Sequence, residues 1–352
     1  MQPSVLRTRA YSRRAGSTFV LLTLVLAALL SQLALALESI VLVGSGSSVP
    51  LPLFRKWTSE YNKRNPAIQM QYLPLGTSEG IKQISHGVGD FGAGEVPLTT
   101  KERGEGNLIE LPVVLIGIVP IYNLPGVTRD LKFSGDLLAE IFLGHVKSWN
   151  APQIVRLNPG VTLPNLPIKV VYRPGGKGSN YVFTDFLSKT SSRFREEIGV
   201  SPSPKWPAGA PAERSSDMAD KVRGETGSIG YVELQYAVAE KIPYGLILNP
   251  AGKFVKASST TITAACRAAE TPQWDKFSAS LTNAPGADSF PISSFSWIYV
   301  RTSSSDPRRK DALVDLLNWF FSNGQQFSAQ EGYSPLPREL LVKIKTQISS
   351  IH

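Results

Sequence analysis

The chain has 352 residues, a formal net charge of +9 and a single cysteine, Cys266. This length allows two domains with their own cores, and one cysteine excludes a framework of intrachain disulfides. No histidine or second thiol lies near Cys266 in the sequence, so we expect a small buried side chain there. The basic residues are scattered and interrupted by acids, a pattern that does not favour nucleic-acid binding.

Residues 1–36 have the three parts of a secretory signal peptide. Four arginines precede an apolar run over residues 19–30, and an Ala-Leu-Ala sequence follows at residues 34–36. The apolar run is short for a membrane span. We therefore expect cleavage after Ala36 and a mature chain that is soluble in the periplasm or another extracytoplasmic space. The Arg13-Arg14 pair leaves twin-arginine export open.

From residue 37 onward, segments with strand and helix patterns alternate, which predicts an α/β architecture with largely parallel sheets. The expected strands are residues 39–46, 68–76 and 109–123, and the expected helices are residues 53–65, 77–87, 134–144 and 310–324. We expect the last two helices to end at glycine. A stretch rich in proline and glycine at residues 199–217 is expected to be a surface loop. The Asp90-Phe91-Gly92 triplet is expected to end a core strand, with Asp90 in a turn.

Three polar loops rich in glycine follow expected strands and precede expected helices. They are GSGSSVP at residues 44–50, GTSEG at residues 76–80 and RPGGKGSN at residues 173–180. Such junctions lie at the carboxyl ends of parallel strands, where ligands bind. Each helix N-terminus offers unpaired N–H groups to an anion, although one such loop alone is better explained as a helix cap and turn. Three loops, one with Arg173 and Lys177, suggest a shared anion site.

The sequence contains enzyme motifs whose partners are absent. GTSEG matches the nucleophile elbow of serine hydrolases, with Ser78 as the nucleophile. The three histidines, His86, His145 and His352, are poorly placed to complete a triad. The DFG triplet lacks the other kinase motifs, and the histidines and cysteine form no zinc pattern. We therefore expect a binding protein and not an enzyme, with no cofactor and no metal.

A series of motifs resembles the periplasmic phosphate-binding protein family of the ABC-type phosphate uptake system. The matching stretches include GSGSSVPLPLFRKWTSEY, GTSEGIKQI, DFGAGEVPL, VVYRPGGKGSNYVFTDFL and GSIGYVELQYA, in family order over most of the mature chain. The resemblance implies a type II periplasmic-binding-protein fold of two α/β lobes, each a mainly parallel sheet flanked by helices, with the ligand in the cleft between them. It places lobe one at residues 37–116 plus 291–352 and lobe two at residues 117–290.

By this resemblance, the phosphate contacts fall on residues of the three loops and on one acid of the GAGEVP stretch. They are Ser48 and Val49 through backbone N–H groups, Thr77, Glu95, Arg173, Lys177, Gly178 and Ser179. The family implies capture of inorganic phosphate and its delivery to the membrane permease of an ABC transporter. We expect a monomer and no nucleic-acid partner.

Three positions depart from the family pattern. Glu95 stands where aspartate is usual, Gly175 replaces an aspartate that steadies the arginine, and Lys177 replaces a small hydroxyl residue. These changes make the expected site more positive. Ordinary phosphate binding is favoured, while a tuned anion preference, another phosphoryl or oxyanion ligand such as arsenate or phosphonate, and a secreted serine hydrolase using Ser78 remain alternatives.

Overall fold

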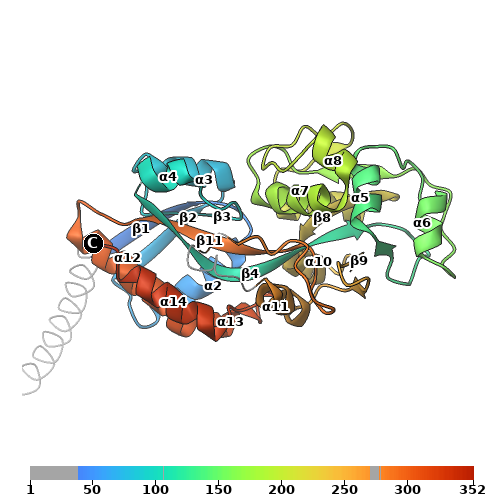
Figure 1. Cartoon of the computed structure of the whole chain (residues 1–352). Coiled ribbons are helices and arrows are strands. Elements are labelled where there is room, and N and C mark those ends of the chain that lie inside the picture. Colours follow the sequence, from blue (N-terminus) through green and yellow to red (C-terminus); the bar gives the residue numbers. More distant parts are fainter. Residues whose placement is uncertain (1–38, 106, 270–276, 278) are drawn as a thin grey trace, which may run out of the picture.

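The computed structural model describes residues 39–105, 107–269, 277 and 279–352. The predicted signal peptide lies outside the described residues. In Figure 1 the elements gather into two lobes joined by long strands, and both lobes combine sheets with flanking helices. This arrangement confirms the predicted α/β two-lobed fold.

The first lobe contains the N-terminal strands and the C-terminal helices. Its elements are β1 (Ile40–Gly46), α2 (Leu51–Asn62), β2 (Ile68–Leu73), α3 (Thr77–Ser85), β3 (Phe91–Gly94), α4 (Thr100–Glu105), β11 (Ser293–Arg301), α12 (Pro307–Trp319), the π-helix η2 (Phe320–Gly324), α13 (Gln325–Ser328) and α14 (Arg338–Ile348). Strand β1 pairs in parallel with β2 and β3, while β11 runs antiparallel to β3.

The second lobe is built from the middle of the chain. Its elements are β5 (Lys132–Phe133), α5 (Gly135–Phe142), α6 (Pro152–Leu157), β6 (Lys169–Tyr172), α7 (Gly178–Thr190), α8 (Ser192–Glu197), β7 (Ala210–Pro211), α9 (Ser215–Gly224), β8 (Ser228–Glu233), α10 (Leu234–Ala239), β9 (Leu246–Leu248) and β10 (Phe254–Val255). Helix α11 (Ser259–Ala268) follows and contacts β11 and β4 (Leu108–Tyr122). Strand β6 pairs in parallel with both β7 and β8.

Strand β4 (Leu108–Tyr122) connects the two lobes. All 15 residues except Ile109 are buried, as the long apolar run in the sequence predicts. Its first part pairs with β11 and its last part with β8, so one sheet of order β2-β1-β3-β11-β4-β8-β6-β7 continues through the molecule. The predicted lobe boundary between residues 116 and 117 falls inside β4. The boundaries stay predictions.

Two of the sequence predictions about local structure need correction. The last long helix does not end at Gly324, because Gly324 has helical φ and the chain continues through η2 into α13. The Asp90-Phe91-Gly92 triplet does not end a strand but leads into β3; Asp90 lies in a bend before it, as predicted, and its carboxylate accepts hydrogen bonds from Arg309 and from the Val43 N–H. The backbone at Gly324 and at Asp90 is therefore set by contacts with distant parts of the chain, Trp57 and Arg309.

The structure also bears on the single cysteine and on membrane-spanning helices. Cys266 is buried, as predicted. Among the described residues, no helix combines the length and the apolar character needed to cross a membrane.

Candidate functional site: an anion-binding cleft

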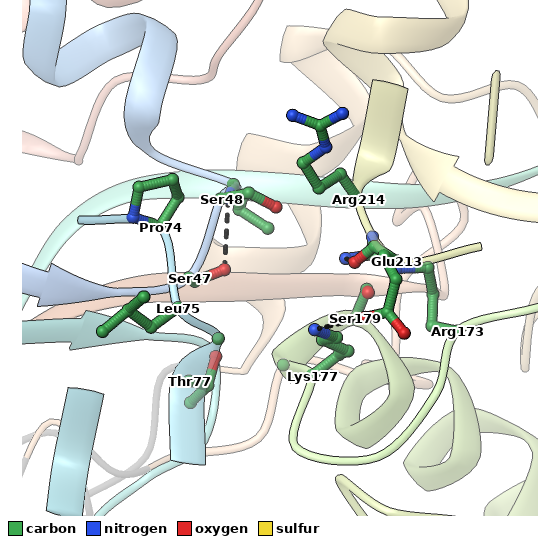
Figure 2. A pocket seen from close by; sticks show the side chains of 13 residues that line it. Ser47, Ser48, Pro74, Leu75, Thr77, Arg173, Lys177, Ser179, Glu213 and Arg214 are labelled. Carbon is green, nitrogen blue, oxygen red and sulfur yellow. Dashed lines mark hydrogen bonds and ion pairs between the residues drawn. The ribbon is translucent and has the colours of Figure 1, made fainter. Parts of the chain in front are cut away.

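A cavity of about 300 Å³ lies between the two lobes, at the carboxyl ends of parallel strands from both sheets. In Figure 2 the side chains of Ser47, Ser48 and Thr77 face those of Arg173, Lys177 and Ser179 across it. The lining residues are Ser47, Ser48, Val49, Pro74, Leu75, Gly76, Thr77, Arg173, Lys177, Gly178, Ser179, Glu213 and Arg214.

The first lobe contributes the loop after β1 and the start of α3. The Val49 N–H donates to the hydroxyl of Ser47 at 3.1 Å, so an arriving anion would compete with that hydroxyl for this donor. Gly76 precedes α3 with a φ of +103°, a backbone conformation that favours glycine. This turn leaves the N-terminus of α3, with Thr77 as its first residue, directed at the cavity.

The second lobe contributes Arg173, which follows β6 and is only 3% exposed. Its Nη1 donates to Ser215 Oγ at 3.0 Å and its Nη2 to the Glu213 carbonyl at 2.9 Å, while its Nε has no partner among the described groups. These contacts come from Glu213 in the turn after β7 and from Ser215, the first residue of α9. They hold the Arg173 guanidinium in position, a role that the family pattern gives to an aspartate where this chain has Gly175.

Lys177 lies at the edge of the cavity and does not extend into solvent. Its side chain is 16% exposed, and its Nζ is 3.3 Å from Oε2 of Glu213, whose own side chain is 69% exposed. The backbone N–H of Lys177 donates to the Pro202 carbonyl, and Lys177 immediately precedes α7. The cavity therefore has three basic residues on the second lobe, Arg173, Lys177 and Arg214.

Glu95 follows β3 and lies beside the cavity, fully buried. Its Oε1 accepts a hydrogen bond from Ser296 Oγ at 2.9 Å, and its Oε2 accepts one from Thr77 Oγ1 at 3.2 Å. The pKa of this carboxyl is raised to about 7, mainly because burial disfavours the charged form. Hydrogen bonds from neighbouring hydroxyls, Ser47 first among them, lower the pKa and oppose this rise. The negative charge of Glu233 raises the pKa further.

The two lobes touch around the cavity. The Ser78 N–H donates to the Gly176 carbonyl at 3.2 Å, and the hydroxyls of Ser48 and Ser215 are 3.5 Å apart. A Cβ atom built on Gly178 would lie 2.1 Å from Glu95 Oε2 and 2.7 Å from Thr77 Oγ1. Only glycine fits at the start of α7 in this arrangement, because the helix N-terminus approaches Glu95 so closely.

Seven of the eight residues expected from the sequence line the cavity, namely Ser48, Val49, Thr77, Arg173, Lys177, Gly178 and Ser179. Glu95 is not among the lining residues, but it contacts one of them, Thr77. Sequence reasoning missed Ser47, Pro74, Leu75, Gly76, Glu213, Arg214 and the supporting Ser215.

The stretch at residues 199–217 is more than the surface loop that its composition predicts. It contains β7, which adds a strand beside β6, and the start of α9. Glu213 and Arg214 reach the cavity from this stretch. The signal in the sequence was Ser215-Ser216-Asp217, a helix-start pattern that proline and glycine before it obscured.

The serine-hydrolase alternative has no geometric support. Ser78 lies in the first turn of α3, whereas His86 caps the other end of the same helix and contacts the Lys82 carbonyl. About eight residues of helix separate the two side chains, roughly 12 Å along the axis. His145 contacts Glu140 and Arg193 in the second lobe, and His352 contacts the Ser350 carbonyl. Within the described residues, no group of three His, Cys, Asp or Glu could hold a metal ion.

Comparison with known proteins decides the family. The model of the PBP superfamily domain matches residues 27–324. The phosphate-binding protein PstS of Pasteurella multocida (strain Pm70) is 35% identical over 328 residues, covering 92% of this chain and 94% of the relative. The chain belongs to the phosphate-binding protein family. Its members bind a solute, so the chain is a binding protein and not an enzyme.

Solved structures show the same fold. A high affinity periplasmic phosphate-binding protein (PfluDING) bound with phosphate has a TM-score of 0.70 at 17% identity, covering 87% of this chain and 93% of that chain. An ABC-type phosphate transport receptor from Vibrio cholerae has a TM-score of 0.56 at 16% identity, with 84% of this chain and 100% of that chain covered. The two-lobed fold is thus shared across large sequence distances.

Proposed function

We propose that this protein is an extracytoplasmic solute-binding protein that captures inorganic phosphate in the cleft and delivers it to an ABC transporter. The observation that carries the proposal is a buried carboxylate, Glu95, in contact with Thr77 beside a cavity whose lining includes hydroxyls, helix N-termini and three basic side chains. Relatives named as phosphate-binding proteins support this ligand. The eight residues predicted from the sequence are proposed to contact the anion.

The donors of the cleft suit a dehydrated tetrahedral anion. Ser179 offers a hydroxyl, the starts of α3 and α7 offer N–H groups, and Arg173 offers charge and a donor fork. The Thr77 hydroxyl already donates to Glu95, so Thr77 contributes as the first residue of α3. Each hydrogen bond to a charged group contributes about 1.5–3 kcal/mol. An anion held by such donors can shed its water without a large net penalty.

Glu95 supplies the selectivity. Phosphate near neutral pH still carries a proton, which can be donated to the Glu95 carboxylate. Sulfate has no proton, so it would meet the ionised carboxylate with a lone pair and a like charge. A loss of several kcal/mol amounts to roughly a thousandfold discrimination. Below pH 7 a protonated Glu95 can itself donate, so the discrimination should weaken there.

The departures from the family pattern are compatible with phosphate. The Glu213 carboxylate pairs with Lys177, and the Glu213 backbone carbonyl accepts a hydrogen bond from Arg173. An acid of the β7–α9 turn therefore offsets the positive charge that the family's aspartate at position 175 would otherwise balance. The longer side chain of Glu95 is held by Ser296 and Thr77. Arsenate is the main alternative ligand, because it is also tetrahedral and also carries a proton near neutral pH. Only a comparison of the two binding affinities distinguishes arsenate from phosphate.

The remaining parts of the proposal follow from the family and the leader sequence. Export by the signal peptide at residues 1–36 would place the mature chain outside the cytoplasm. The partner is the membrane permease of a phosphate transporter, and the working form is a monomer. Closure of the two lobes over the anion, hinged on the long strands between them, would create the shape that the permease recognises.

Isothermal titration of the mature chain, residues 37–352, with phosphate, sulfate and arsenate tests the ligand assignment. We expect tight phosphate binding and no sulfate binding at pH 8. The absence of heat with phosphate up to millimolar concentration would overturn the assignment. Glu95→Gln should narrow the gap between phosphate and sulfate, because the amide can turn its NH₂ towards an unprotonated oxygen. An unchanged gap would remove Glu95 from this role.

A further inference from the structure

Three consecutive backbone carbonyls in the loop after β1 each accept a hydrogen bond from a tyrosine hydroxyl. The three bonds are Tyr72 Oη to the Ser47 carbonyl at 2.7 Å, Tyr236 Oη to the Ser48 carbonyl at 3.4 Å and Tyr333 Oη to the Val49 carbonyl at 2.6 Å. The same loop lines the cavity and is expected to bind the anion through its N–H groups. The tyrosines therefore act on the part of the backbone that would meet the ligand.

The three tyrosines come from distant parts of the chain. Tyr72 lies in β2 and Tyr333 follows α13, both in the first lobe, whereas Tyr236 lies in α10 of the second lobe. They are 25, 284 and 188 residues away from the carbonyls that they contact. The Tyr72 ring is fixed by an edge contact with Phe54 and by stacking on Phe91. No local turn produces this set, so the fold gathers three hydroxyls on one loop.

Holding these carbonyls fixes the direction of the N–H groups that follow them. A peptide unit is planar and trans, so its N–H points opposite to its C=O. The Ser47 carbonyl shares a peptide unit with the Ser48 N–H, and the Ser48 carbonyl shares one with the Val49 N–H. These two N–H groups are the backbone donors expected to bind the anion. Figure 2 shows Ser47 and Ser48 at the cavity, where the Ser47 hydroxyl accepts from the Val49 N–H at 3.1 Å.

Tyr333 acts on the next peptide unit. Its partner, the Val49 carbonyl, precedes Pro50, which has no N–H to offer. Pro50 immediately precedes α2, and Tyr333 is only 1% exposed. The bond from Tyr333 therefore anchors the end of the loop to the first lobe at the start of α2.

The three hydroxyls remain donors at physiological pH. Burial raises the pKa of Tyr72, Tyr236 and Tyr333 above the usual value for tyrosine, so each hydroxyl keeps its proton. A hydrogen bond accepted by a carbonyl also polarises the peptide unit and strengthens its N–H as a donor. The hydroxyls thus both direct the N–H groups and increase their attraction for an anion.

We propose that these three tyrosines are positioning residues of the anion site. They hold the loop after β1 so that the N–H groups of Ser48 and Val49 are directed at the ligand. This proposal rests on the proposed phosphate function. Tyr72 and Tyr333 preform the loop within the first lobe, while Tyr236 adds its bond from the second lobe.

Tyr236 makes the loop sensitive to the relative position of the lobes. Its bond to Ser48 is the longest of the three, and Ser48 meets the second lobe again at Ser215, where the two hydroxyls are 3.5 Å apart. Separation of the lobes would break both contacts and leave the Leu51 N–H, at 3.3 Å, to hold the Ser48 carbonyl. Tyr236 should therefore act after the lobes have met, by slowing the release of the bound anion.

Substitution of each tyrosine by phenylalanine removes the hydroxyl and keeps the ring. We expect Tyr72→Phe, Tyr236→Phe and Tyr333→Phe each to weaken phosphate binding about three- to tenfold in titrations of the mature chain. In stopped-flow measurements, Tyr236→Phe should release phosphate faster and bind it at the wild-type association rate. Slower association with an unchanged release rate would contradict the role assigned to Tyr236.

A matched control is Tyr244→Phe. The Tyr244 hydroxyl also donates to a backbone carbonyl, that of Ala257 at 3.5 Å, and neither residue lines the cavity. This variant should bind phosphate like the wild type. A purely structural role of the three tyrosines would lower the urea midpoint of unfolding and leave phosphate affinity unchanged, and that result would overturn the proposal. Failure of the wild type to bind phosphate would instead overturn the proposed function.

If the phenylalanine variants do not fold, a crystal structure of the wild type with phosphate decides. The proposal predicts that all three hydroxyls stay within hydrogen-bond distance of their carbonyls while the Ser48 and Val49 N–H groups donate to the anion. Carbonyls that have left the tyrosines, or N–H groups that point away from the anion, would contradict the proposal.

Discussion

Glu95 is a fully buried carboxyl group whose protonation is linked to the stability of the fold. Its pKa is about 7 in the folded chain against 4.5 in a solvated one, because burial disfavours the carboxylate. Between these two pH values the folded state keeps a proton that the unfolded state releases. The free energy of unfolding of the ligand-free protein therefore falls as pH rises from about 4.5 to 7, by about 3 kcal/mol in total.

Glu95→Gln should remove this pH-dependent loss. We expect the variant to be more stable than the wild type by about 1–3 kcal/mol at pH 8 and nearly equal to it at pH 4.5. Urea unfolding in phosphate-free buffer at the two pH values measures the difference. An equal stability difference at both pH values would show that Glu95 titrates normally in the folded chain.

Lys177 and Glu213 give a second prediction at the scale of single residues. The pair lies at the edge of the cavity, and Glu213 is largely exposed, so the pair itself stabilises the fold little. Glu213→Gln should leave Lys177 free to attract the anion and raise phosphate affinity a few-fold at low salt. Since screening weakens exposed charges, the gain should shrink in 0.5 M salt.

Titration at both salt concentrations measures this effect. Glu225→Gln is a matched control, because Glu225 pairs with Lys169 on the same lobe and neither residue lines the cavity. The role assigned to Glu213 is wrong if both variants change phosphate affinity equally.

At the scale of elements, the cleft is formed by helix starts that meet across the lobes. Gly178 opens α7 against Glu95 and Thr77, and no space remains for a Cβ atom. Gly178→Ala should therefore push α7 away from the first lobe and weaken phosphate binding tenfold or more, about 1.4 kcal/mol. Gly224→Ala, at the end of α9, places its Cβ in open space and should bind like the wild type.

Titration of the two variants with phosphate compares them directly. Equal affinity in Gly178→Ala and Gly224→Ala would mean that the close approach of α7 to Glu95 is not part of the bound state.

Most elements near the site could be predicted from the sequence, because their periodicity and caps are local. β1, β2 and β4, and the helices after the glycine loops, lie where the patterns place them. The continuation of the last long helical segment past Gly324 could not be predicted, because Gly324 keeps helical φ where it packs on Trp57; a Cβ there would be 3.0 Å from the indole. β7 is two residues long and exists only because β6 is beside it.

At the scale of the whole molecule, the site depends on contacts between distant parts of the chain. Ser296 reaches Glu95 across 201 residues, and Ser215 meets Ser48 across 167. The family resemblance identified the residues of the three loops, since each loop carries its own motif. Glu213 lies in no motif, Ser215 shows only a helix-start pattern, and nothing local in the sequence links Ser296 to Glu95, so only the folded sheet brings these residues to the cleft.

The two-lobed arrangement predicts how anion binding would change the relative position of the lobes. Contacts between the lobes, such as Ser78 N–H to the Gly176 carbonyl, lie at the edge of the cavity and not in its centre. An anion bound by both lobes would add attraction where the two surfaces face each other. Phosphate should therefore favour the closed arrangement and bury Glu95 against its ligand.

A crystal structure of the mature chain grown with phosphate and without sulfate tests the central claim most directly. We predict a tetrahedral anion in the cavity between Thr77, Arg173 and Ser179, with one phosphate oxygen within hydrogen-bond distance of the Glu95 carboxylate. A phosphate bound elsewhere, or one in this cavity that does not contact Glu95, would contradict the account.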